Sequence, residues 1–144
     1  MKKLIILVLV VIALFSGCNN NEEVNIYSRE FTVAPGQWEF AGALWDGAYY
    51  EYWKYEVPVV QLTKQVFEKG VVMAYLMQQN AKSPLPYTIF DIVEVTDGDD
   101  HWNIQYEENY SFEFRPNYVT FMVKFSEDLD FPPLRSTFQV VMMW

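Results

Sequence analysis

From residue 25 onward, short stretches in which apolar and polar residues alternate are separated by clusters of Gly, Pro, Asn and Asp. Alternation with a period of two is the pattern of β-strands that bury one face. Strands that recur roughly every 8–12 residues, with turn signals between them, are typical of a β-sandwich. We therefore predict a single all-β, antiparallel sandwich domain over residues 25–144. Its strands are expected over residues 25–33, 37–40, 49–57, 71–77, 87–95, 101–106, 110–114, 118–125 and 136–144.

In some of these strands the pattern also predicts which face is buried. Trp53 and Val57 fall on one face of the segment 49–57, and we expect that face to meet the core. The last strand places Phe138 and its alternate neighbours on one apolar face. Residues 71–77 are nearly all apolar, which is typical of a central strand that is covered on both faces.

One segment follows helical periodicity instead. Leu62, Val66 and Phe67 form a single apolar stripe over residues 62–69. Gly70 follows directly, at the position where helices commonly end with a residue in the left-handed conformation. We predict one short helix that ends at Gly70.

Three connections carry further turn signals. Residues 41–43, of sequence Ala-Gly-Ala, are expected to form a flexible link. Asp97 and Gly98 are a favoured pair for a tight hairpin turn. Residues 126–133 are expected to form an acidic loop.

The beginning of the chain has a different pattern. Lys2 and Lys3 precede an unbroken apolar run over residues 4–15. A basic start followed by a short apolar run is the layout of a secretory signal. The run is shorter than the roughly 20 residues that a membrane-spanning helix needs. We therefore predict a cleaved signal peptide over residues 1–17.

The apolar run ends in Phe15-Ser16-Gly17-Cys18, which resembles the lipobox of bacterial lipoprotein precursors. Ser16 and Gly17 supply the small side chains that the processing peptidase needs, although Phe15 stands where Leu is usual. The Cys18 thiol would take the diacylglycerol, with fatty acyl chains such as palmitate. The alternative is that Cys18, the sole cysteine, is a buried core residue, but its place at the expected cut favours lipidation.

The polar residues after Cys18 are expected to form a lipidated tether over residues 18–24. Glu22 and Glu23 loosely fit the acidic signal that directs lipoproteins of Bacteroidota to the outer surface. A plain hydrophilic spacer explains them equally well. We expect anchoring in the outer membrane through the lipid on Cys18, with the domain on the cell surface or on the periplasmic face.

The charge of the chain restricts its partners. The formal net charge is −9, and loss of Lys2 and Lys3 with the signal lowers it to about −11. An acidic surface disfavours nucleic acid, whose binding needs basic patches, and it disfavours docking on anionic lipid by charge. Cations or basic partners are favoured instead.

Several stretches together resemble a group of small, uncharacterised lipoproteins of Bacteroidota. In that group a short helix ends at a glycine, a strand of the form V-x-x-Y-L follows, and a Leu-Pro-Tyr turn comes after. The matching stretches here are residues 62–76, 84–88 and 138–141. The resemblance implies a cell-envelope location and a short β domain of unknown function, and it implies no catalytic residue.

Aromatic residues are the best candidates for recognition. Trp45, Tyr50, Tyr52 and Trp53 lie in one stretch, and Trp102 lies in a later strand. Flat rings stack on the apolar faces of sugars, and Trp and Tyr are common anchors of protein interfaces. The alternative is that these rings fill the core, because an all-β core needs residues of this kind.

One acidic turn is a weak candidate for calcium. Asp97, Asp99 and Asp100 could offer oxygen ligands, but their spacing does not match the EF-hand loop. An exposed hairpin turn has the same residue preferences. A second acidic loop over residues 127–130 would join such a site only if the fold brought the two loops together. His101 is the sole histidine and Cys18 is expected to be acylated, so we do not expect zinc, and no motif predicts a cofactor.

Four carboxylates lie among aromatic residues, as in sites that process sugars. They are Glu51, Glu107, Glu108 and Glu113. A pair of them would need a defined separation to hydrolyse a glycoside, which spacing along the chain does not establish. We therefore expect a non-enzymatic, lipid-anchored binding module whose partner is a glycan or an envelope protein. A structural subunit of an envelope assembly is the alternative, and a small hydrolase is a remote one.

Overall fold

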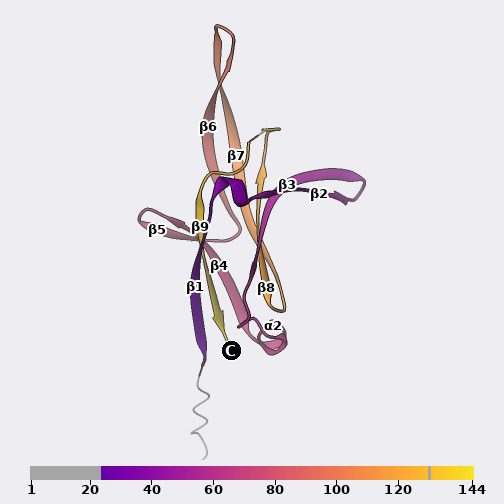
Figure 1. The fold of residues 1–144 in the computed structure, drawn as a ribbon, viewed down its shortest axis with the longest axis vertical. Coiled ribbons are helices and arrows are strands. Elements are labelled where there is room, and N and C mark those ends of the chain that lie inside the picture. Colours follow the sequence, from indigo (N-terminus) through magenta and orange to yellow (C-terminus); the bar gives the residue numbers. More distant parts are fainter. Residues whose placement is uncertain (1–23, 130) are drawn as a thin grey trace, which may run out of the picture.

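The computed structural model describes residues 24–129 and 131–144 (Figure 1). Residues 1–17, predicted to be a signal peptide, and Cys18 lie outside the described residues. Along the described chain the elements are β1 (Ile26–Val33), the 3-10 helix η1 (Pro35–Gln37), β2 (Glu39–Trp45), β3 (Ala48–Pro58), α2 (Lys64–Lys69), β4 (Val71–Gln78), β5 (Ala81–Pro84), β6 (Tyr87–Asp97), β7 (Asp100–Arg115), β8 (Tyr118–Phe125) and β9 (Ser136–Met143).

The strands form two antiparallel sheets that pack together, which confirms the predicted all-β sandwich with one short α-helix in the described chain. The four-stranded sheet has the order β1-β9-β4-β5, and the five-stranded sheet has the order β2-β3-β8-β7-β6. The last strand therefore pairs with the first strand, in register from Ile26 opposite Met143 to Val33 opposite Ser136.

The core lies between the two sheets. Phe138, Val140 and Met142 of β9 are fully buried, as their alternation predicted. Phe121 of β8 is also fully buried and stacks on Phe138 across the interface, with ring centroids 4.2 Å apart and planes inclined by 12°. Trp53 is half-buried against this core, so it faces inward as expected.

Helix α2 connects the two sheets between β3 and β4. The Thr63 hydroxyl accepts a hydrogen bond from the Val66 amide at the N-terminus of the helix, and Leu62 and Val66 are buried. Phe67, the third member of the predicted stripe, is 43% exposed and packs edge-on against Phe114. Leu62 precedes the helix, which begins at Lys64, and the adjacent residues Val66 and Phe67 point about 100° apart, so Phe67 leaves the buried side.

The left-handed conformation predicted for Gly70 is wrong, because its φ is −86° and its ψ is 175°. Glycine is required here by a close approach instead. A Cβ atom on Gly70 would lie 2.7 Å from the carbonyl oxygen of Val66 and 2.8 Å from that of Met143. The chain passes into β4 directly against the end of β9, so a side chain has no room.

Three other predictions need correction. Strand β4 is central in its sheet, but it is not buried on both faces: Ala74 and Leu76 are buried, while Tyr75 on the outer face is only half-buried. Residues 41–43 belong to β2 and are not a flexible link, because they pair with β3. The two short strands predicted over residues 101–114 are one 16-residue strand, β7, because residues 107–109 keep pairing with β6.

Several hairpins extend the sandwich. The β6–β7 hairpin projects along the long axis, and the β2–β3 hairpin projects to one side (Figure 1). The predicted turn between β6 and β7 is confirmed within one residue: Asp97 pairs with Asp100, and Gly98, with a φ of 64°, begins the two-residue loop. Within residues 24–129 and 131–144, no helix is long and apolar enough to cross a membrane.

Candidate functional site

One candidate site lies where β2 and β3 leave the rest of their sheet. Strand β3 pairs with β8 from Pro58 back to Trp53, which lies opposite Val123. Pairing between β2 and β3 continues beyond that point to Trp45 and Ala48, at the end of the hairpin. The hairpin therefore separates from the end of β8, and a fork opens between the hairpin and the loop that follows β8 (Figure 1).

A cavity of about 200 Å³ occupies this fork, and we refer to it as the aromatic hollow. Four aromatic residues of β2 and β3 contribute to its walls, and the opposite wall comes from the end of β8 and the acidic loop after it. The lining residues are Phe40, Tyr50, Glu51, Tyr52, Trp53, Lys124, Phe125, Ser126, Glu127, Asp128 and Leu129.

The rings of the aromatic hollow form a corner rather than a flat platform. Phe40 and Trp53 lie opposite each other on β2 and β3, with centroids 5.2 Å apart and planes inclined by 67°. Phe40 is 56% exposed, and Tyr50 is 39% exposed. The Lys124 ammonium lies 4.4 Å from the centroid of the Tyr50 ring, which holds one positive charge against an aromatic face.

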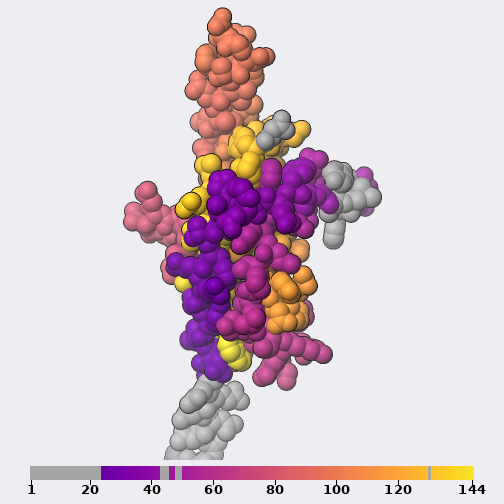
Figure 2. Space-filling model, viewed as in Figure 1, coloured from indigo at the N-terminus to yellow at the C-terminus, as the bar shows by residue number. Residues whose placement is uncertain are grey.

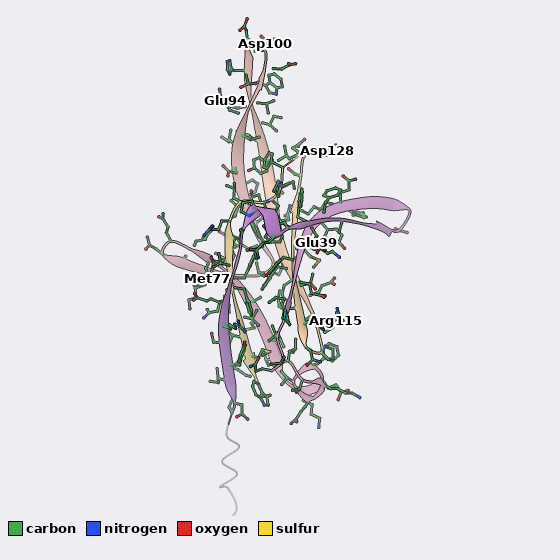
Figure 3. The ribbon with its side chains drawn as sticks, in the orientation of Figure 1. Glu39, Met77, Glu94, Asp100, Arg115 and Asp128 are labelled. Atoms are coloured by element: carbon green, nitrogen blue, oxygen red, sulfur yellow. The ribbon has the colours of Figure 1, made fainter. Side chains whose placement is uncertain are left out.

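The loop opposite these rings is fixed at its start. The Ser126 hydroxyl accepts a hydrogen bond from the Glu107 amide at 2.9 Å, and the Ser126 amide donates to the Glu107 carbonyl oxygen at 3.0 Å. The loop then carries Glu127 and Asp128 along the hollow, and Figure 3 labels Asp128 at this loop. Carboxylate acceptors, an ammonium donor and aromatic faces thus border one small cavity.

A second, wider hollow of about 650 Å³ lies on the outer face of the same sheet, and Tyr52 lines both. Its charged groups are largely paired with each other. Arg115 donates to both carboxylate oxygens of Glu56, at 3.1 and 2.9 Å, and Lys54 lies 3.8 Å from Glu39. We regard this second hollow as the weaker candidate because its polar groups already have partners within the protein.

The structure brings together three of the predicted recognition residues, Tyr50, Tyr52 and Trp53, in the aromatic hollow. Trp102 is 45% exposed on β7, in the projecting hairpin, and it does not line the hollow. The side chain of Trp45 lies outside the described part of the chain. Phe40 also lines the hollow, although the sequence analysis did not nominate it for recognition. Its position at the end of the predicted strand 37–40 was the one local feature that could have indicated it.

Lys124 was also not predicted as a site residue, and no feature of the neighbouring sequence distinguishes it. It is one of several lysines in the chain, and it reaches Tyr50 only because β8 lies beside β3. Glu127 and Asp128 were considered only as part of a second acidic loop. The fold places that loop beside the β2–β3 hairpin instead.

The weak calcium candidate gains no support from the geometry. Within the described residues, which include Asp97, Asp99 and Asp100, no three Asp, Glu, His or Cys side chains gather as a group that could hold a metal ion. Figure 3 places Asp100 at the tip of the projecting hairpin, well away from Asp128. The two acidic loops therefore do not meet.

The four carboxylates considered for hydrolysis are distributed over different places. Glu51 lines the aromatic hollow, Glu113 lines the wider hollow, and Glu107 lies at the base of the projecting hairpin. Glu108 points into the protein from β7 and is only 5% exposed.

Two tyrosines satisfy the buried Glu108 carboxylate. The Tyr106 hydroxyl donates to Oε1 at 3.3 Å, and the Tyr110 hydroxyl donates to Oε2. Burial, together with the neighbouring Glu108 and Asp91 carboxylates, raises the pKa of Tyr106 to about 12. Burial and the hydrogen bond to Glu108 also raise the pKa of Tyr110. This cluster explains how a carboxylate can remain in the interior of the sandwich.

Comparisons with sequence-family profiles, with curated proteins and with solved structures found no match to this chain. The resemblance to lipoproteins of Bacteroidota therefore stays a prediction.

Proposed function

We propose that this protein is a lipid-anchored, non-enzymatic binding module of the bacterial cell envelope, and that the aromatic hollow binds the end of a glycan chain. The observation that carries the proposal is the inclined pair of Phe40 and Trp53 rings, which lines one cavity together with Tyr50, an acidic loop and Lys124. Aromatic faces pack on the apolar faces of sugar rings, and carboxylates accept hydrogen bonds from sugar hydroxyls.

The size and shape of the hollow favour a small unit over a long one. Its volume of about 200 Å³ is below the roughly 300 Å³ at which pockets for drug-sized ligands begin. Because the Phe40 and Trp53 planes are inclined by 67°, the hollow offers two walls to one sugar ring and not a flat track for many. A terminal sugar unit fits these walls better than the middle of a chain.

The anchoring part of the proposal rests on the sequence. Residues 4–15 form the apolar run of a signal, and Cys18 follows two small residues. A lipid on Cys18 would hold the domain within a few residues of the membrane, since β1 begins at Ile26. The proposed location is the outer membrane, on the surface or the periplasmic face.

A titration with defined sugars tests the glycan proposal. Full-length protein, extracted in detergent, is titrated with oligosaccharides of β-linked glucose, β-linked N-acetylglucosamine, α-linked mannose and β-linked xylose, and tryptophan fluorescence is recorded. We expect at least one series to bind, with the shortest members nearly as tight as the longest. Tyr50→Ala and Phe40→Ala should each weaken that binding roughly tenfold, because each removes an aromatic side chain that lines the hollow.

A matched control separates loss of the site from loss of an aromatic ring in general. Tyr75 is half-buried on the outer face of β4, in the opposite sheet, so Tyr75→Ala makes the same chemical change away from the hollow. Its binding should stay close to that of the unmodified protein. Equal losses in Tyr50→Ala and Tyr75→Ala, or no binding to any series, would contradict the proposal.

A second candidate function, a role in an envelope protein assembly, is favoured by a different observation. Several large apolar side chains on the β6–β7 hairpin are exposed to solvent. Exposed apolar surface of this kind commonly marks a protein interaction site.

A further inference from the structure

The outer part of the β6–β7 hairpin extends beyond the sandwich, and we call residues 90–107 the arm. Only its base, at Tyr106 and Glu107, contacts the rest of the sandwich. Strand β8 pairs with β7 only up to Glu108, which lies opposite Phe125. Strand β6 is the edge of its sheet. Beyond Glu107, which still exchanges hydrogen bonds with Ser126, the two strands pair only with each other, and the arm projects as a two-stranded ribbon (Figures 1 and 2). Strand edges of this kind present backbone groups that can accept another strand.

The arm carries apolar side chains that the sandwich does not cover. On one face, Val93 lies opposite Ile104 and Val95 lies opposite Trp102. This is a continuation of the inward face of the sheet, and its last buried residue is Tyr106, whose ring meets Phe125 and Phe131.

From residue 90 to residue 105 no side chain is buried. The opposite face of the arm is also apolar near its base, where Phe90 is 76% exposed and Ile92 is 55% exposed. A ribbon of two strands is marginally stable in water by itself, so apolar residues on both faces favour an additional layer or strand. The surface thus has the character of an interface without its partner.

The charge of the arm indicates what that partner is. Its 18 residues contain six carboxylates and neither Lys nor Arg, namely Asp91, Glu94, Asp97, Asp99, Asp100 and Glu107. Within the arm, Nδ1 of His101 lies 3.3 Å from a carboxylate oxygen of Glu94, so one of these carboxylates already has a neighbour. Figure 3 labels Glu94 and Asp100 along this exposed ribbon. Most of its negative charge is therefore available to a partner.

We propose that the arm docks a basic protein segment in extended conformation, in which Lys or Arg alternates with apolar side chains. The apolar side chains would cover the Val95–Trp102 face, and the basic side chains would meet the surrounding carboxylates. A second copy of this chain fits less well, because it would bring two strongly acidic arms together. Anionic lipid and nucleic acid are disfavoured for the same reason.

The direction of the arm agrees with this role. The start of β1 and the tip of the arm lie at opposite ends of the long axis (Figure 1). A chain that is anchored through Cys18, ahead of β1, would hold the arm away from the membrane and toward other proteins. This arrangement adds to the proposal, but the docking surface itself depends on neither the anchor nor the aromatic hollow.

Designed peptides supply the probe, because the natural partner is not identified. Three labelled peptides of about ten residues, the upper range of a strand, are compared. The first alternates Leu with Lys, the second alternates Ser with Lys, and the third alternates Leu with Glu. Their binding to the full-length protein is measured by fluorescence anisotropy. We expect the Leu-Lys peptide to bind most tightly, and raising the salt from about 50 mM to about 500 mM should weaken its binding severalfold.

Paired variants locate the binding on the arm. Val95→Ser and Trp102→Ala should each weaken Leu-Lys binding roughly tenfold, whereas Val60→Ser, at a 69% exposed position outside the arm, should not. A double variant of the arm, Asp99→Asn with Asp100→Asn, should weaken binding. The control double variant, Glu30→Gln with Glu68→Gln, lies outside the arm and changes the net charge equally, so it should weaken binding less. Melting temperatures confirm that each variant remains folded.

A measurement on the unmodified protein keeps the test independent of variants. On binding of the Leu-Lys peptide, backbone amides of residues 90–107 should exchange hydrogen more slowly, while those of β1 should not change. Protection outside the arm, equal losses in the two charge pairs, or equal binding of the Leu-Glu peptide would overturn the proposal. Loss of oligosaccharide binding with retention of peptide binding would contradict only the glycan proposal.

Discussion

Phe121 and Phe138 join the two sheets face to face. One ring comes from β8 and the other from β9, both are fully buried, and their centroids are 4.2 Å apart. Further aromatic residues, Phe31 and Tyr110, pack on the same pair at 6.2 and 6.1 Å. This cluster, together with the aliphatic residues around it, forms the centre of the core.

Removing one ring of this pair should destabilise the whole domain. Phe121→Ala is expected to lower the free energy of unfolding by about 3–5 kcal/mol, because it removes buried apolar surface and leaves a cavity. Phe90→Ala, at a 76% exposed position, should change it by less than about 0.5 kcal/mol. Denaturant unfolding measures both values, and similar losses for the two variants would contradict the assigned core.

Gly70 should tolerate no side chain. Gly70→Ala would place a Cβ atom 2.7 Å from one carbonyl oxygen and 2.8 Å from another, both in the backbone, so the helix end or β9 must shift. We expect a loss of at least about 1 kcal/mol in the free energy of unfolding. A Cβ atom on Gly36 would have no neighbouring atom within 4 Å, so Gly36→Ala is the matched control and should have little effect. Equal stability of the two variants would disprove the close approach.

The tyrosine cluster around Glu108 should make the fold sensitive to alkali. The pKa of Tyr106 is raised from 10.0 to about 12. Between these pH values the Tyr106 hydroxyl keeps its proton in the folded state and loses it in the unfolded state. The stability from this group is complete below about pH 10 and is lost as the pH rises toward about 12. Tyr106→Phe should therefore flatten the fall in melting temperature over this range. A fall as steep as in the unmodified protein would show that Tyr106 does not contribute to it.

Lipidation should depend on one residue. Cells that express the full chain are fed an alkynyl analogue of palmitate, and membrane and soluble fractions are compared. We expect label in the membrane fraction for the unmodified chain and its loss in Cys18→Ala. Ser16→Thr, which keeps the cysteine, serves as the control for expression. Membrane-bound, labelled Cys18→Ala protein would refute the lipoprotein prediction.

The orientation of the anchored domain can be measured on intact cells. If the protein is displayed on the surface, proteinase K should remove the domain from intact cells. If it faces the periplasm, the domain should survive until the cells are lysed. Survival after lysis would show instead that the fold resists the protease, and the assay would then need a cleavable insertion at the hairpin tip near Gly98, where chains tolerate insertion.

The local pattern was enough to predict most strands. Residues 118–125 and the alternation of β9 were predicted correctly, because a period of two reports directly which side chains leave water. The interior of β7 was not, since Glu108 breaks the apolar pattern. Its carboxylate is acceptable there only because Tyr106 and Tyr110 donate hydrogen bonds to it.

The candidate sites were predictable only in part. Tyr50, Tyr52 and Trp53 could be nominated as aromatic residues in one stretch, but the sequence left open whether they pack in the core or bind a ligand. The answer depends on Lys124 and the acidic loop, which reach the hairpin through the pairing of β3 with β8. Trp102 was nominated with them, yet it belongs to a separate surface on the arm, where it lies opposite Val95.

The sequence by itself determined the strand periodicity, the short helix, the acidic balance and the predicted lipid anchor, because each depends on residues that are close along the chain. Tertiary structure decided which strands are neighbours. It therefore decided that β1 pairs with β9 and that β7 extends past the end of β8. It also decided the exposure of each apolar face. A period of two shows that a strand has an apolar face, but only the length of the opposing layer decides whether water still reaches it.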